Sequence, residues 1–182
     1  MADFSVRGRE VVVVGAARSG VAAAELARRR GATVTLTETR PVCDQADRLQ
    51  AAGVRLELGG HQPSTLAQAD LIVVSPGVPV DQPIFDGPRA RGVEVIGELE
   101  FASRWLRGRV IAITGTKGKS TTTTLIGRML EASGRHTLVG GNIGTPVASQ
   151  VDASTPDTVH VIEVSSFQLE TTRTFHPWIA VW

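Results

Sequence analysis

The glycine-rich segment "GTKGKST" (residues 115–121) joins an apolar stretch to a helix-like one and carries the residues best suited to chemistry. The first N–H groups of a helix lack partners, and the helix dipole is positive there, so a phosphate is favoured at that end. Gly115 and Gly118 allow the loop to turn its N–H groups inward. Lys119 can then reach the outer phosphates of a bound nucleotide, and Ser120 can offer its hydroxyl to Mg²⁺. The segment predicts a nucleoside triphosphate site, although Ile113 stands where the usual phosphate loop has glycine.

Glu163 is the candidate carboxylate for the metal ion at this site. It lies in "TVHVIEVSS" (residues 158–166), an otherwise apolar run that we expect to be a strand. Burying a carboxylate costs several kcal/mol unless it is paired or binds a metal. The alternative is a glutamate that faces solvent from an edge strand. His160 and His176 have no metal-ligand spacing, and we interpret them as packing or surface residues.

A second glycine-rich segment, "GAARSG" (residues 15–20), stands where a dinucleotide fingerprint G-x-G-x-x-G would lie. Ala17 replaces the middle glycine, which normally lets the backbone approach a pyrophosphate. Glu38 follows about 20 residues later, where an acid can accept from a ribose hydroxyl or a base. These features favour nucleotide binding but not NAD; a structural turn without a ligand is the alternative. "SPGVP" (residues 75–79) ends another strand, and by itself it indicates only a turn.

These segments require an α/β fold with parallel sheets, because apolar strands alternate with helical stretches. We expect a Rossmann-like domain over residues 1–108, followed by the first part of a P-loop α/β domain over residues 109–182. Helices are expected to cover both sheet faces, and Ser19 and Gly31 are expected to begin and end the first helix. The expected helices are 19–31 and 119–134; the expected strands are 10–16, 32–38, 54–59, 69–77, 92–97, 109–115, 136–141, 158–166 and 176–182.

Composition excludes several other classes of protein. The 182 residues are 42% hydrophobic and 20% charged, as in ordinary globular proteins, and 19 basic against 18 acidic residues give a net charge of +1. The chain has no surplus of basic residues, so its charge does not indicate nucleic acid or an anionic membrane as a partner. The single cysteine, Cys43, excludes an internal disulfide and a multi-cysteine zinc site, and we interpret it as a bystander. With no long apolar segment or signal core, we expect a cytoplasmic protein.

Five segments together resemble the Mur ligases over essentially the whole chain: "GTKGKSTTT", "GGNIGTP" (140–146), "EVSSFQLE" (163–170), "SPGVP" and "GELEFA" (97–102). The shortened phosphate loop is the form typical of that family, which accounts for Ile113. "SSFQLE" resembles the member that adds D-glutamate to UDP-N-acetylmuramoyl-L-alanine in peptidoglycan synthesis. Folylpolyglutamate synthetases share the ATP loop but lack a preceding UDP-binding domain.

The resemblance implies an ATP- and Mg²⁺-dependent reaction through an acyl phosphate, with Lys119 and Glu163 as catalytic residues. Ser120 would hold one Mg²⁺ at the phosphates, and Glu163 would hold a second Mg²⁺ that positions the acyl phosphate oxygens. Family members commonly have aspartate at the position of Glu38 and asparagine at the position of Lys117. Glu38 keeps the negative charge, whereas Lys117 changes the side chain that would contact ATP. The ATP loop would be Gly115, Thr116, Lys117, Gly118, Lys119, Ser120 and Thr121. The UDP part would contact Arg18, Ser19, Gly20, Glu38, Thr39, Arg40, Ser75 and Gly77, and the muramoyl-alanine end Asn142, Ser165 and Gln168.

The resemblance also implies that the family's histidine, its carbamylated lysine, most adenine contacts and its D-glutamate-binding domain lie beyond residue 182. We therefore expect a fragment, monomeric, that binds UDP-muramoyl-alanine weakly and does not catalyse ligation. Two alternatives remain. An NAD-dependent dehydrogenase is opposed by Ala17 and the second loop and is tested by NADH titration. A non-catalytic nucleotide-binding module is tested by extending the reading frame past Trp182: a stop codon there would favour it, and an "NxxxDH" stretch followed by a further α/β domain would oppose it.

Overall fold

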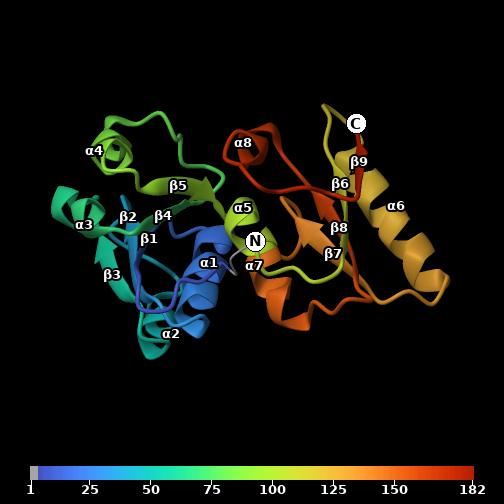
Figure 1. Cartoon of the computed structure of the whole chain (residues 1–182), viewed down its shortest axis with the longest axis horizontal. Coiled ribbons are helices and arrows are strands. Elements are labelled where there is room, and N and C mark those ends of the chain that lie inside the picture. The colour runs from blue at the N-terminus through green and yellow to red at the C-terminus, as the bar shows by residue number, and fades with distance from the viewer. Residues whose placement is uncertain (1–3) are drawn as a thin grey trace.

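The computed structural model describes residues 4–182, in which the strands form two separate parallel sheets (Figure 1). Every strand pair in both sheets is parallel, as the alternation of strands and helices predicts. The first sheet has the order β3-β2-β1-β4-β5 and the second the order β7-β8-β6-β9. The strands are β1 (Glu10–Val14), β2 (Thr33–Glu38), β3 (Arg55–Leu58), β4 (Leu71–Val74), β5 (Glu94–Gly97), β6 (Arg109–Ile113), β7 (Thr137–Gly141), β8 (Val159–Glu163) and β9 (Ile179–Val181).

Helices connect most of these strands, and α1 and α6 are the long ones. None of the helices in residues 4–182 combines the length and the apolar character needed to cross a bilayer. The helices are α1 (Arg18–Arg29), α2 (Ala46–Ala51), α3 (Pro63–Gln68), η1 (Pro83–Phe85), α4 (Asp86–Ala90), α5 (Glu98–Ser103), α6 (Lys119–Ala132), α7 (Val147–Gln150), η2 (Val151–Ala153) and α8 (Ser166–Leu169).

The side chains of β1 alternate between two hydrophobic clusters, because successive strand residues point to opposite faces of a sheet. Val11 and Val13 pack with residues of α1 and α5, whereas Val12 and Val14 pack with Leu66 of α3 and Phe85 of η1. Both faces of the first sheet are therefore covered, as predicted. Each fully buried side chain of this size contributes about 1.5–3 kcal/mol to folding.

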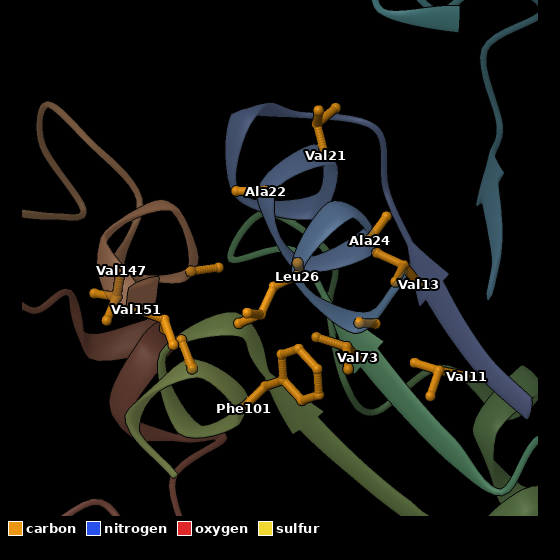
Figure 2. Packing of buried hydrophobic residues seen from close by; sticks show 14 of the residues in the cluster. Val11, Val13, Val21, Ala22, Ala24, Leu26, Val73, Phe101, Val147 and Val151 are labelled. Carbon is orange, nitrogen blue, oxygen red and sulfur yellow. The ribbon is translucent and has the colours of Figure 1, made fainter. Parts of the chain in front are cut away.

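The larger cluster continues from the first sheet into the second half of the chain. It contains Leu26 of α1 and Phe101 of α5 together with Val147 of α7 and Val151 of η2. Figure 2 shows these side chains side by side with those from the strands of the first sheet. The two sheets are thus connected through a shared apolar core, which fixes how the loops at their carboxyl ends face each other.

The predicted α/β fold class is confirmed, and the strands and long helices lie where the sequence predicts them. The predicted cap at Ser19 is wrong. Gly15 turns the chain with a φ of 97°, so helix α1 begins at Arg18, and its N-cap is Ala17. Gly31, with a φ of 85°, follows α1 as expected. The division into two domains at residue 108 stays a prediction, with one sheet on either side of it.

Candidate functional site

The loop after β6 has the backbone shape that a phosphate site requires. Gly115 and Gly118 have φ values of 129° and 81°, in the left-handed region that favours glycine. Gly118 is the N-cap of α6, so no side chain occupies the N–H groups of the first turn. The ammonium of Lys119 lies over the loop, with Nζ donating to the carbonyls of Gly115 at 2.7 Å and Thr116 at 3.4 Å. The backbone donors and the lysine therefore gather at one end of α6.

Glu163 ends β8, a central strand, and is only 1% exposed. Its Oε2 accepts a hydrogen bond from Ser120 Oγ at 2.7 Å, and its Oε1 accepts one from Asn142 Nδ2 at 3.0 Å. The strand register explains this meeting, because Glu163 pairs with Ile113 at the end of β6 and with Gly141 at the end of β7. A solvent-facing glutamate on an edge strand is thereby excluded.

The Ser120–Glu163 pair has the chemistry of a magnesium site. Mg²⁺ prefers oxygen ligands and is usually held by one or two carboxylates, with water and substrate phosphates completing its shell. Within residues 4–182 no group of three or more His, Cys, Asp or Glu side chains has metal-binding geometry. That finding opposes an all-protein metal cage but agrees with a site of one carboxylate and one hydroxyl beside a phosphate loop. The residues present therefore fit Mg²⁺ bound together with a nucleotide.

Glu38 ends β2 and is almost fully buried beside the first glycine loop. Its carboxylate accepts from the backbone N–H of Ala16 at 2.8 Å, from Thr39 Oγ1 at 3.1 Å, and from the backbone N and Nη2 of Arg40 at 3.1 and 3.2 Å. Burial raises the pKa of Glu38, but these hydrogen bonds outweigh burial and lower the pKa to about 2. A carboxylate has about four acceptor positions. In this conformation, Glu38 therefore orders the loop between Ala16 and Arg40.

Other residues predicted to contact the UDP part surround the same loop. Arg18 and Arg40 are exposed, and Arg18 Nη1 donates to the carbonyl of Gly144 at 3.2 Å, near the turn that carries Asn142. Ser75 is buried, and its hydroxyl donates to the carbonyl of Gly15 at 2.9 Å. Ser19 is half-buried in the first turn of α1, Gly20 is buried there, and Thr39 and Gly77 are exposed.

Two adjoining cavities extend from this loop toward α8. One of about 310 Å³ is lined by Gly15, Glu38, Thr39 and Ser75 among others. The other, of about 560 Å³, shares Ser75, Gly77, Val78 and Pro79 with it and continues to Gln168 and Thr171. Ser120 and Thr121 instead line a separate hollow on α6. The structure thus places four predicted UDP contacts, Glu38, Thr39, Ser75 and Gly77, on these two cavities. Arg18 and Arg40 line a third cavity on the other side of Ala17.

The three residues predicted at the muramoyl-alanine end have different positions. Ser165 and Gln168 form a capping box on α8, in which Gln168 Oε1 accepts from Ser165 N at 3.0 Å and Ser165 Oγ accepts from Gln168 N at 3.3 Å. Gln168 lines the larger cavity, whereas Asn142 contacts Glu163. The remaining loop residues Thr116 and Lys117 are exposed.

The sequence analysis missed several residues that line these cavities: Glu98 and Thr171 in the larger one, and His61 and Gln82 in the smaller. Glu98 directly follows β5, at the carboxyl edge of a parallel sheet where ligands collect. That position was the signal that could have identified it.

Comparison with known protein families gives two matches that together span most of the chain. Residues 9–97 match the Mur ligase MurD-like N-terminal domain, and residues 113–182 match the Mur ligase middle domain. A UDP-N-acetylmuramoylalanine–D-glutamate ligase of Acidobacterium capsulatum is 49% identical over 98% of this chain, and one of Koribacter versatilis is 47% identical over 97%. The chain spans only 39% and 40% of the lengths of these relatives.

Solved structures support the same fold. A murein peptide ligase from Psychrobacter arcticus superposes with a TM-score of 0.58 at 24% identity, over 95% of this chain and 42% of that chain. A UDP-N-acetylmuramate–alanine ligase from Thermotoga maritima superposes with a TM-score of 0.53 at 20% identity, over 86% of this chain and 37% of that chain. At these identities the likeness is evidence for the fold alone.

Proposed function

This chain belongs to the Mur ligase family, and we propose that it carries the UDP-substrate-binding and ATP-binding parts of a ligase that joins D-glutamate to UDP-N-acetylmuramoyl-L-alanine in peptidoglycan synthesis. The observation that carries the proposal is the meeting of Ser120, Asn142 and Glu163 at the start of α6, directly beside the glycine loop. Relatives that are 49% and 47% identical over nearly the whole of this chain bear the name of that ligase. We also propose a cytoplasmic location and a monomeric state for the ligase.

The ATP loop would act through residues 115–121. Backbone N–H groups at the start of α6 would hold the phosphates of ATP, and Lys119 Nζ would exchange the carbonyl of Gly115 for a phosphate oxygen. Such charge-assisted hydrogen bonds are about twice as strong as neutral ones. Lys119 therefore offsets charge on the group that is transferred.

Glu163 and Ser120 would supply the protein oxygens to Mg²⁺, which reduces the repulsion between the triphosphate and the incoming alanyl carboxylate. The alanyl carboxylate of the substrate would take the γ-phosphoryl group of ATP to form an acyl phosphate. The amine of D-glutamate would then attack the acyl phosphate and release phosphate. Asn142 donates a hydrogen bond to Glu163 and would hold the Glu163 side chain in place. These roles make Lys119 and Glu163 the catalytic residues of this chain.

The UDP-sugar would lie along the two adjoining cavities. Arg18 and Arg40 present exposed guanidinium groups beside the first loop, where a diphosphate would be attracted. Ser75 and Gly77 line both cavities, so they would contact the middle of the ligand. Gln168 lines the far end, which suits the muramoyl-alanine part.

Isothermal titration calorimetry of this chain tests the proposal directly. We expect binding of UDP-N-acetylmuramoyl-L-alanine and, separately, of ATP with Mg²⁺, and we expect omission of Mg²⁺ to weaken ATP binding. NADH is the control ligand and should not bind, because Ala17 replaces the central glycine of a dinucleotide loop. Binding of neither UDP-sugar nor ATP would contradict the proposal and leave only the fold.

A further inference from the structure

The cavity of about 560 Å³ lies where the two halves of the chain meet. Its wall contains Ser75 and Glu98, which follow strands of the first sheet, and Gln168 and Thr171, which follow β8 of the second. Gly97 allows this close meeting, because a Cβ at that position would collide with the hydroxyl of Thr171. A ligand in this cavity would therefore touch both halves of the chain at once.

Two residues that line this cavity each carry a buried polar atom without a hydrogen-bond partner among residues 4–182: Glu98 Oε2 and Gln168 Nε2. The two residues are only 1% and 2% exposed. A buried polar atom without a partner costs about 1–3 kcal/mol. Two such atoms on residues that line one cavity indicate a ligand that offers each of them a partner once the side chains turn toward it.

The hydrogen bonds on the other ends of these side chains define what that ligand must offer. Gln168 Oε1 accepts from the backbone N and the hydroxyl of Ser165 at 3.0 and 3.2 Å, so the free Nε2 can only donate. Glu98 Oε1 accepts from the backbone N–H of Ala148 at 2.6 Å, which leaves Oε2 as the free end. Burial raises the pKa of Glu98 to about 7, although the Ala148 N–H opposes this. A donor from the ligand would favour the ionised, accepting form.

We propose that Glu98 and Gln168 together recognise a secondary amide of the substrate, with Glu98 Oε2 accepting the amide N–H and Gln168 Nε2 donating to the amide carbonyl. The N–H and C=O of a trans amide point in opposite directions, so one amide can bridge α5 and α8. This inference rests on the proposed function, since UDP-N-acetylmuramoyl-L-alanine carries two such groups, the N-acetyl amide and the alanyl amide. Glu98 thereby becomes a specificity-determining residue, and its bond to Ala148 connects the bound amide to α7.

Calorimetry with a ligand series tests this proposal on the whole 182-residue chain. The series is UDP, UDP-N-acetylglucosamine, UDP-N-acetylmuramic acid and UDP-N-acetylmuramoyl-L-alanine, titrated into the wild type and into Glu98→Gln. Gln keeps the side-chain volume and can still accept from Ala148, but it presents a donor to the cavity. We expect about tenfold weaker binding of the amide-bearing ligand that is recognised, with UDP binding within twofold of the wild type. The first ligand in the series to show the loss identifies which amide is bound.

Glu131→Gln is the matched control, because Glu131 is exposed on α6 and does not line either of the two cavities. Its Kd values should stay within twofold of the wild type. Equal weakening of UDP and of the amide-bearing ligands by Glu98→Gln would mean a purely structural role and overturn the proposal, as would no weakening at all. A wild type that binds none of the series would contradict the proposed function itself, which is a different result.

A ligand-side change keeps the test valid if Glu98→Gln does not fold. In UDP-N-acetylmuramoyl-L-alanine, an ester oxygen replaces the N–H of the N-acetyl amide in one analogue and of the alanyl amide in another. One of the two analogues should bind the wild type about tenfold more weakly than the parent. If both analogues bind as well as the parent, the recognition of an amide N–H is disproved.

Discussion

Glu38 and Glu163 occupy equivalent places in the two halves of the molecule, yet their surroundings differ. Each ends a parallel strand, is buried, and lies beside a glycine-rich loop that begins a helix. Glu38 accepts from two backbone N–H groups, a hydroxyl and the guanidinium of Arg40. Among residues 4–182, the Glu163 carboxylate accepts from a hydroxyl and a side-chain amide, both neutral. The protein itself therefore compensates the charge of Glu38 but not that of Glu163.

This difference indicates two uses of a buried carboxylate. A carboxylate with its acceptor positions filled by backbone and side-chain donors of its own loop holds that loop in one conformation and has little left to offer a ligand. A carboxylate with two neutral, movable side-chain donors remains available to a cation, which can replace the Ser120 hydrogen as its partner. The first glycine loop is thus ordered by its own hydrogen bonds, whereas we expect the second to be completed by the nucleotide and cation that we propose it binds.

The strongest test of this contrast is Glu163→Gln. Removing the charge should weaken the binding of ATP with Mg²⁺ by about 100-fold, or about 2.7 kcal/mol, because the metal loses the Glu163 carboxylate. The melting temperature of the chain without ligand should change little, since Gln fills the same volume. Calorimetry with ATP and Mg²⁺ gives the affinity, and Glu38→Gln is the matched control, expected to bind within threefold of the wild type. Nearly unchanged binding by Glu163→Gln would remove the distinction between the two acids.

Glu38→Gln should instead affect stability. Replacing a carboxylate that accepts from backbone donors and Arg40 should lower the free energy of unfolding by about 2 kcal/mol at pH 7. The folded-state pKa of Glu38 lies below its ordinary value of 4.5, at about 2. Its contribution is therefore fully present above pH 4.5 and is lost as the pH falls through 2. Urea denaturation of both proteins at pH 7 and pH 3 should show the difference shrinking at the lower pH; a constant difference would contradict the assignment.

Features encoded by short segments could be predicted from the sequence. Runs such as "EVVVVGA" and "RVIAITG" indicate buried strands that end in glycine loops, and an acid inside an apolar run indicated the burial of Glu163. Parallel strands bring their carboxyl ends to one edge, so a carboxylate near Ser120 could also be expected. These inferences need only strand direction and local composition.

Features that depend on how the two sheets pack could not be predicted. Glu98 receives its hydrogen bond from Ala148, which lies 50 residues away on a helix of the other half. Cys43 stands in a polar stretch, but its side chain is buried in the cluster under α1. Neither position can be inferred before the shared apolar core between the sheets is known.

A smaller effect is expected from Asn142→Ala, which removes one of the neutral donors to Glu163. Loss of this hydrogen bond should destabilise the unliganded chain by about 1 kcal/mol. A cation can become the partner of Glu163 Oε1, which loses its donor in this variant. ATP with Mg²⁺ should therefore raise the melting temperature of the variant by more than it raises that of the wild type. Scanning calorimetry with and without the nucleotide measures both shifts. An equal shift in the two proteins would show that Asn142 and the cation do not compensate the same charge.

The smallest effect should come from Arg40→Ala, and it separates the two sources of compensation at Glu38. The guanidinium is 3.2 Å from Glu38 Oε2, but its side chain is 62% exposed. Exposed ion pairs contribute little to stability and weaken with salt. The free energy of unfolding of the variant should therefore be only slightly below that of the wild type at low salt, and the difference should be smaller at high salt. Because Ala16 and the backbone of residue 40 still donate to Glu38, its pKa, followed by NMR titration, should remain well below 4.5. A return of the pKa to 4.5 would mean that Arg40, rather than the folded loop, compensates this buried charge.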